Sequence, residues 1–265
     1  MTTKMANTSQ SERARLGGLA RIALYGNPGT VGGRSKGGKK TTSMFRNNPA
    51  FAKRLGFILR KEIKYPEESL KLAEFIGIML GDGGLSGNHQ ITISFNNKTD
   101  REYAEYICKI IRQLFLVDYH IHKRRKSYGA DIVLNSSNLV DFLISRGLKV
   151  GNKVKNQTGV PRWINKNPQY ETACLRGLMD TDGGLYYHKY SVRGKAYTYL
   201  KLGFGNRSKP LLRFVFKVLR RLGYRVSLNG DNVSISSGLE VKRYFAEIGS
   251  SNPKHINKFK NYFSN

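Results

Sequence analysis

The chain has 265 residues, of which 39% are hydrophobic, so it is long enough to bury one large core or two ordinary ones. Lysine and arginine number 46 against 18 aspartates and glutamates, which gives a formal net charge of +28 at pH 7. This composition excludes a chain that is disordered throughout, and the charge predicts a polyanionic partner, chiefly nucleic acid.

Residues 1–60 form a compositional unit with twelve basic residues, the single acid Glu12 and nine glycines. Glycine and charge at this density oppose compact packing, which predicts a flexible or partly ordered basic extension that lies along phosphates. The stretch "GRSKGGKK" (33–40) nearly matches the phosphate-binding loop GxxxxGK[ST], but Lys40 stands where the magnesium-binding hydroxyl belongs. Nucleotide binding is therefore not expected there.

Regular periodicity begins near residue 67. It predicts, in chain order, a helix over 67–84, an alternating strand over 89–95, a helix over 98–115, strands near 119–124 and 130–135, and a helix over 137–147. We interpret residues 67–155 as one repeat of order αββαββα, in which one of the first two strands has no residue range assigned.

The same order returns after a linker, residues 156–170, that carries Pro161 and Pro168. Over residues 171–261 the patterns predict a helix to 184, a strand over 196–205, a helix over 209–223, strands over 224–230 and 232–237, and a helix over 239–249. Two tandem copies of one module predict a pseudo-two-fold α+β arrangement.

Each repeat opens with a helix that carries small residues at every fourth position. These residues are Ala73, Gly77 and Gly81 in the first helix and Ala173, Gly177 and Thr181 in the second. Spacing of four places them on one helix face. Glycine costs a helix interior about 1 kcal/mol relative to alanine, and close approach of two backbones is a compensating reason. The stripes therefore predict a seam between the two helices.

Such a seam brings together the acids that end the helices, Asp82 and Asp182. Helix C-termini carry partial negative charge and two close carboxylates repel each other, so divalent cations between them are expected, and hard oxygen ligands suit magnesium. The alternative is that each Asp-Gly-Gly is only a helix cap with its turn. Because Leu80 stands opposite Asp180, the shared acids are Asp82 and Asp182.

The phrases "FIGIMLGDG" (75–83) and "LRGLMDTDG" (175–183) resemble the two signature helices of LAGLIDADG homing endonucleases, in their single-chain, two-motif form. The resemblance covers residues 67–261 and departs from the family at Leu80, where the family often has Asp. It implies saddle-shaped antiparallel sheets that straddle duplex DNA, with the motif helices packed at the interdomain seam.

The resemblance also implies the chemistry of the site. Asp82 and Asp182, with the backbone carbonyls of Gly81 and Thr181, would hold two or three Mg²⁺ ions shared between the acids, and Mn²⁺ would substitute. Metal-activated water would then attack one phosphodiester in each strand.

Around this centre the family places a basic residue late in each repeat and a polar residue at the end of the second strand. The matching positions, taken as catalytic candidates, are Lys153, Lys254, Asn97 and Asn206. Lysine can neutralise charge on a phosphate or orient water. The asparagines have a second reading as strand-end turn formers. Arg101 is a candidate on one side only, since Pro210 stands opposite.

The sheet faces are the predicted DNA readers, because a sheet can lie in the major groove and present alternate side chains to base edges. The charged tip "KRRKSY" (123–128) is expected to grip phosphates. Since the two faces differ in sequence, the target should be long and asymmetric. The candidate contacts are Asn88, Gln90, Thr92, Ser94, Arg124, Arg125, Lys126, Tyr128, Tyr197, Tyr199, Lys201, Arg225, Ser227 and Asn229.

Cys108 and Cys174 fall in apolar helical patterns without a CxxC pair or clustered histidines, so we expect buried hydrophobes rather than a disulfide or a zinc site. No apolar stretch is long enough for a bilayer, and the N-terminus lacks a signal-peptide core. We expect an intracellular protein, of a prokaryotic cytoplasm or an organelle matrix, with no membrane partner.

The function predicted is a site-specific, Mg²⁺-dependent double-strand DNA endonuclease, intron-encoded and monomeric. The alternative is an RNA-binding intron maturase, a splicing cofactor of the same fold that binds host intron RNA and needs the basic surface but not the acids. Retention of both acids and both lysines favours the nuclease.

Overall fold

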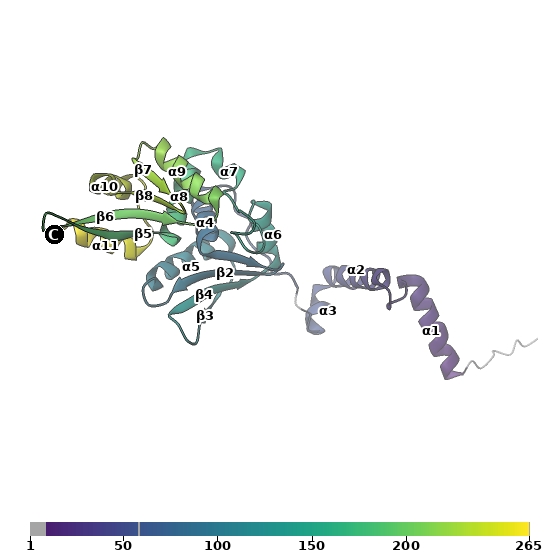
Figure 1. Ribbon diagram of the computed structural model, residues 1–265. Coiled ribbons are helices and arrows are strands. Elements are labelled where there is room, and N and C mark those ends of the chain that lie inside the picture. Colours follow the sequence, from purple (N-terminus) through teal and green to yellow (C-terminus); the bar gives the residue numbers. More distant parts are fainter. Residues whose placement is uncertain (1–8, 58, 265) are drawn as a thin grey trace, which may run out of the picture. The chain divides into compact units, whose positions relative to one another are not determined.

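The computed structural model describes residues 9–57 and 59–264. Its chain divides into two compact units, Met1–Leu59 and Arg60–Asn265 (Figure 1). Within the described ranges no helix is long and apolar enough to cross a membrane.

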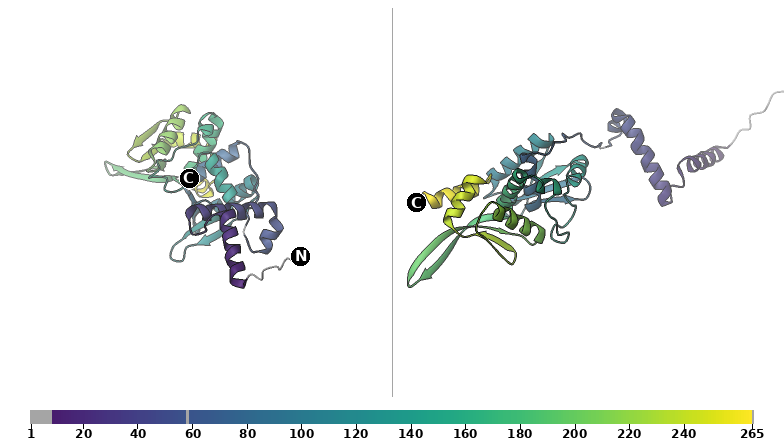
Figure 2. Two further views of the ribbon diagram at one scale, coloured as in Figure 1. Left: turned by 90° about the vertical axis from the view of Figure 1, so that its right-hand side faces the viewer. Right: turned by 90° about the horizontal axis from the view of Figure 1, so that it is seen from above.

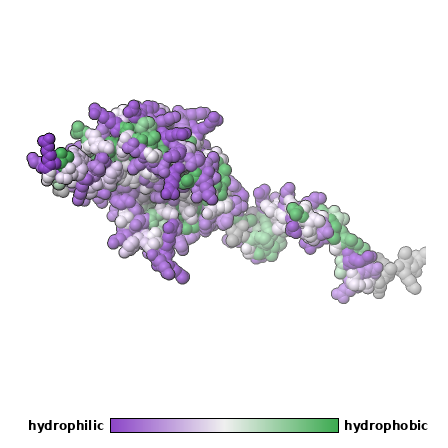
Figure 3. All heavy atoms as spheres, in the orientation of Figure 1, coloured by the Kyte–Doolittle hydropathy of each residue, from purple (hydrophilic) through white to green (hydrophobic). Residues whose placement is uncertain are grey.

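The described residues of the N-terminal unit form three helices, α1 (Gln10–Tyr25), α2 (Val31–Asn47) and α3 (Pro49–Arg54). The basic extension is thus helical over much of its length, which its glycine content did not predict; its first eight residues and Ile58 lie outside the described residues. Helix α1 buries none of its residues, and Figure 3 shows hydrophobic atoms among the hydrophilic ones on this unit.

Residues 33–40 lie inside α2 and form a helix rather than a loop. Gly33 has a local reason to be glycine. A β-carbon at Gly33 would lie 1.7 Å from the carbonyl oxygen of Asn27. The backbone of the turn before α2 can therefore lie this close to residue 33 only because that residue is glycine.

The larger unit contains the two predicted repeats. The first runs α4 (Leu70–Gly81), β1 (Gly83–Ser86), β2 (Gln90–Asn96), α5 (Arg101–Phe115), β3 (His120–Lys123), β4 (Gly129–Asn135) and α6 (Ser137–Ser145). The second follows a short helix α7 (Arg162–Asn165) and runs α8 (Pro168–Thr181), β5 (Gly183–Val192), β6 (Lys195–Gly205), α9 (Lys209–Arg221), β7 (Val226–Asn229), β8 (Asn232–Ile235) and α10 (Gly238–Glu247). A last helix, α11 (Pro253–Phe263), follows the second repeat.

Both sheets are antiparallel and four-stranded, with the matching orders β1-β2-β4-β3 and β5-β6-β8-β7. This confirms the predicted α+β fold of tandem αββαββα repeats. Each sheet buries one face under helices: Ile91 and Ile93 of β2 and Leu200 and Leu202 of β6 are in the core. The other face of each sheet remains open for contacts.

The two sheets differ in one respect. Strands β5 and β6 pair from Gly183–Phe204 out to Val192–Lys195, whereas β8 pairs with β6 only from Leu202 to Gly205. The outer part of this hairpin therefore extends past its sheet, as Figure 2 shows.

Helices α4 and α8 pack face to face where the repeats meet (Figure 1). A β-carbon at Gly77 would lie 2.3 Å from the carbonyl oxygen of Cys174, and one at Gly177 would lie 2.3 Å from that of Glu74. The glycine stripes therefore form the predicted seam. Both cysteines are buried and free, also as predicted.

Candidate active site at the end of the helix seam

The seam ends where Asp82 and Asp182 form the C-caps of α4 and α8. Their backbones are nearly identical, with φ −86° and ψ −5° at Asp82 and φ −86° and ψ −6° at Asp182. A β-carbon at Gly81 would lie 2.0 Å from Thr181 Oγ1, so the two helix ends are in direct contact. The structure thus brings together the two acids that the sequence singled out.

The electrostatics of the pair are those of two carboxylates at converging negative helix ends. Partial removal from water raises the pKa of Asp82 most, and the negative charge of Asp182 raises it further, to about 6. The positive charge of Lys153 opposes the shift. The Asp82 side chain still opens to solvent on one side. Burial also raises the pKa of Asp182, against the charge of Lys153 and a hydrogen bond from Asn206.

Asp82 opens into a hollow of about 280 Å³, here called the Asp82 hollow. Thr181 from the end of α8 lines it, as do Asp100, Arg124 and Lys254. The Lys254 ammonium pairs with Asp100 at 2.5 Å. This lysine thus lies beside Asp82, the acid of the other repeat.

Asp182 opens into a second hollow of about 480 Å³, here called the Asp182 hollow. Gly81 from the end of α4 lines it, together with Lys153, Asn206 and Arg207. Asn206 Nδ2 donates to Asp182 Oδ2 at 2.7 Å. Each hollow therefore combines the acid of one repeat with the motif-helix end and the lysine of the other.

The donor set fits a hard divalent cation. The carboxylates of Asp82 and Asp182 and the carbonyls at the ends of α4 and α8 are all oxygen ligands, and burial raises the pKa of both acids, so a bound cation would favour their charged forms. Among the described residues no group of three or more His, Cys, Asp and Glu side chains could hold a metal ion. Few protein ligands, with positions left for water and phosphate, suit magnesium better than a closed zinc site.

Asp180 has different partners from Asp182. It is 3% exposed, and its carboxylate accepts hydrogen bonds from Ser250 Oγ at 2.5 Å and from the Ser251 backbone N–H at 2.6 Å. Asn252 Nδ2 donates to the Asp180 carbonyl at 3.0 Å. These contacts tie α8 to the segment that leads into α11.

A buried ion pair also crosses the seam. Arg176 Nη2 donates to Glu74 Oε2 at 2.5 Å, and Glu74 is 3% exposed. Tyr106 and Ser251 hydroxyls donate to the other carboxylate oxygen at 2.9 and 2.7 Å. This group was not predicted, although an acid inside an otherwise apolar helix stretch was a signal for it.

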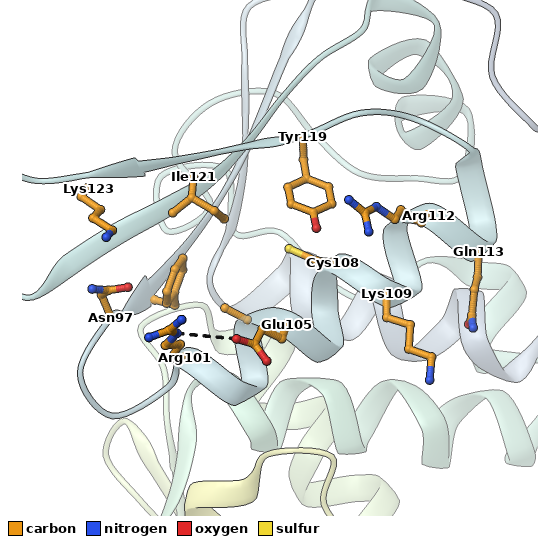
Figure 4. A pocket seen from close by; sticks show the side chains of 12 residues that line it. Asn97, Arg101, Glu105, Cys108, Lys109, Arg112, Gln113, Tyr119, Ile121 and Lys123 are labelled. Carbon is orange, nitrogen blue, oxygen red and sulfur yellow. Dashed lines mark ion pairs between the residues drawn. The ribbon is translucent and has the colours of Figure 1, made fainter.

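Asn97 does not accompany Asn206 into the site. It lines a separate cavity between α5 and the sheet, with Arg101, Cys108 and Tyr119 (Figure 4). The strand register explains the difference. Gly83 pairs with Ile93 and Gly183 pairs with Phe204. Measured from these pairs, Asn97 lies two residues further along its strand than Asn206 does. Asn97 is thereby carried away from Asp82, and Arg101 with it.

The open face of the first sheet carries the predicted polar residues. Gln90, Thr92 and Ser94 alternate with buried residues on β2, while Asn88 lies in the exposed turn before it. Arg124 donates from Nε and Nη2 to Asp131 at 3.1 and 2.6 Å, which holds its guanidinium at the rim of the Asp82 hollow. Asp131 was not predicted as a site residue. Its position as a polar residue between the apolar Ala130 and Ile132 was a signal for it.

The β3–β4 tip is the predicted charged loop. Arg125, Lys126 and Tyr128 are exposed on it, and the Lys98 ammonium lies 5.2 Å from the centroid of the Tyr128 ring. Figure 3 shows hydrophilic residues over this tip.

The second open face is rich in tyrosine. Tyr197, Tyr199 and Lys201 of β6 lie on it, and Tyr190 of β5 stacks on the two tyrosines with centroids 5.2 and 5.3 Å apart. Arg225, Ser227 and Asn229 are exposed before and along β7. The contribution of β5 was missed because no strand was predicted between residues 184 and 196.

Comparisons with known proteins agree with this architecture. No family model matches the chain. The replication factor C small subunit of Methanocaldococcus jannaschii is 28% identical over 209 residues, which is 76% of this chain; the chain spans only about 10% of that protein.

Two solved structures share the fold. A point mutant of I-SmaMI has a TM-score of 0.51 at 10% identity, over 76% of this chain and 90% of that chain. The I-SmaMI LAGLIDADG homing endonuclease bound to cleaved DNA has a TM-score of 0.50 at 8% identity, over 76% and 89% of the two chains. Likeness at these identities concerns the fold.

Proposed function

We propose that this chain, which has the fold of the LAGLIDADG homing endonucleases, is a site-specific double-strand DNA endonuclease that depends on Mg²⁺. The observation that carries this proposal is the pair Asp82 and Asp182, one from each repeat, at the contacting ends of two helices and between two open sheet faces. A purely structural cap has no need of two carboxylates with raised pKa values at one point.

In this proposal Asp82 with the Thr181 carbonyl, and Asp182 with the Gly81 carbonyl, hold the divalent cations. When bound there, magnesium supplies an activated water and neutralises charge on the attacked phosphate. Asn206 fixes the orientation of the Asp182 carboxylate through its 2.7 Å hydrogen bond. Lys254 places a positive charge in the Asp82 hollow, where negative charge builds up on a phosphate during cleavage.

DNA recognition rests on the two open sheet faces. The polar face of β2 and the tyrosine-rich face of β5 and β6 present different side chains at matching places, so one chain reads an asymmetric target without a second copy. The exposed basic residues of the β3–β4 tip and of the N-terminal unit contact phosphates, which position the protein but carry no sequence information.

Selection from a randomised duplex library tests this function. The full chain is incubated with the library in Mg²⁺, and cut molecules are sequenced; Ca²⁺ serves as the binding-only condition. One long, asymmetric sequence cut on both strands is the expected result. Failure to enrich any cut sequence in Mg²⁺, from protein that is folded, would refute it.

A further inference from the structure

The two hollows hold their lysines differently. In the Asp182 hollow, Lys153 Nζ donates to the carbonyl oxygen of Leu80 at 2.9 Å, to that of Met79 at 3.4 Å, and to that of Gly81. These are the last carbonyls of α4, where a cation compensates the negative end of the helix. The Lys153 ammonium thus already occupies a cation position against Gly81, one of the proposed metal ligands.

The acid of the same hollow is engaged as well. One oxygen of Asp182 accepts the amide of Asn206, and the positive charge of Lys153 acts on the carboxylate. Both proposed protein ligands on this side, Asp182 and the Gly81 carbonyl, therefore have a protein partner.

The Asp82 hollow is arranged otherwise. The Lys254 ammonium forms an ion pair with the Asp100 carboxylate at 2.5 Å, and the Asn252 amide donates to the Asp180 carbonyl at 3.0 Å. Within residues 9–57 and 59–264, no hydrogen bond to the Asp82 carboxylate is formed. This carboxylate therefore faces its hollow without a donor.

We infer that the free protein holds a single divalent cation, at Asp82, and that the Lys153 ammonium fills the second cation position until it withdraws from Gly81. The inference rests on the proposed function, because it takes the metal ligands from it. A lysine side chain can leave the cation position, because its ammonium is a compact charge on a flexible stem. It can therefore move to a phosphate when DNA binds. The two centres are then loaded in order, the one at Asp82 first.

Counting bound Mn²⁺ tests the inference without an activity assay. The full chain, free of DNA, is titrated with Mn²⁺ while the electron paramagnetic resonance signal reports the free ion. We expect one bound ion in the wild-type protein, two in Lys153→Met and none in Asp82→Asn. Lys149→Met is the matched control, since that lysine is exposed and lines neither hollow, and it should keep a count of one.

Other counts overturn the inference. Two ions in the wild-type protein, or one in Lys153→Met, would show that the ammonium does not occupy a metal position; an ion retained in Asp82→Asn would show that the first centre is elsewhere. Lys153→Gln repeats the test if Lys153→Met fails to fold by circular dichroism.

The same measurements separate this inference from the function. Protein that gives the expected counts yet cuts no duplex would overturn the endonuclease proposal alone. Protein that cuts duplex but binds two ions without DNA would overturn the inference alone.

Discussion

Gly77 of α4 faces the carbonyl oxygen of Cys174 in α8 so closely that a β-carbon on Gly77 would lie 2.3 Å from that oxygen. The same separation recurs between Gly177 and Glu74, so the seam is closed from both sides. This backbone-to-backbone contact is what allows the two helix ends, and hence the two acids, to meet.

Gly77→Ala should therefore destabilise the larger unit. Overpacking costs about 1–3 kcal/mol, which outweighs the gain of about 1 kcal/mol in helix propensity. Urea unfolding followed by the fluorescence of Trp163, the single tryptophan, measures this unit, because the indole packs on Tyr170.

Gly37→Ala in α2 is the control for that measurement. A β-carbon there meets nothing within 4 Å, so the Trp163 transition should stay where it is. An unchanged midpoint in Gly77→Ala as well would mean that the helices are not in contact at this residue.

Asp180→Asn should cost stability but leave strand cleavage largely intact. Its carboxylate accepts from both Ser250 and Ser251, and an amide can accept at only one oxygen, so a loss of about 1–3 kcal/mol is expected. Cleavage is compared with wild type at a temperature where both are folded. Abolished cleavage in a variant of normal stability would reassign Asp180 to the chemistry.

The raised pKa of Asp82 makes a prediction about pH. With a chelator present, the carboxylate is unfavourable in the folded state when ionised, so Asp82→Asn should melt at a higher temperature than wild type above pH 6. The difference should shrink as pH falls from about 6 to the ordinary value of 3.8, because wild-type protein then takes up its proton. Paired thermal melts across this range measure it; a difference that grows toward low pH would have the wrong sign.

The basic N-terminal unit should add to the salt dependence of DNA binding. Replacing Lys36, Lys39 and Lys40 of α2 with glutamine should lower the slope of log K against log salt by up to about 2.7, at about 0.9 for each phosphate that is no longer neutralised. Binding is measured in Ca²⁺ at several salt concentrations. Equal slopes for the two proteins would remove the phosphate role from this helix.

Much of the candidate site was predictable because its signals are local and repeated. The glycine stripes specify a seam, the duplicated Asp-Gly-Gly marks its end, and alternation along β2 identifies an open face. Lys153 and Lys254 were named from the family resemblance, but their inequivalence was not predicted, because it depends on the partners that each ammonium finds: helix carbonyls for Lys153 and Asp100 for Lys254.

Other features depend on tertiary register, which sequence spacing does not specify. The two-residue difference between β2 and β6 moves Asn97 out of the site although its sequence match to Asn206 is good. Helix α11 was missed despite a signal: Asn252 caps it, Pro253 occupies its first position, and Ile256 and Phe259 recur at helical spacing.

The central claim is that Asp82 and Asp182 together cut DNA, and single-turnover cleavage of the selected target in Mg²⁺ tests it most directly. Asp82→Asn and Asp182→Asn should each lose a factor of about 10²–10³ in rate, the scale expected when charge stabilisation is removed, while binding in Ca²⁺ persists. The exposed Asp118→Asn should cut like wild type. Wild-type cleavage rates in either motif variant would contradict the account.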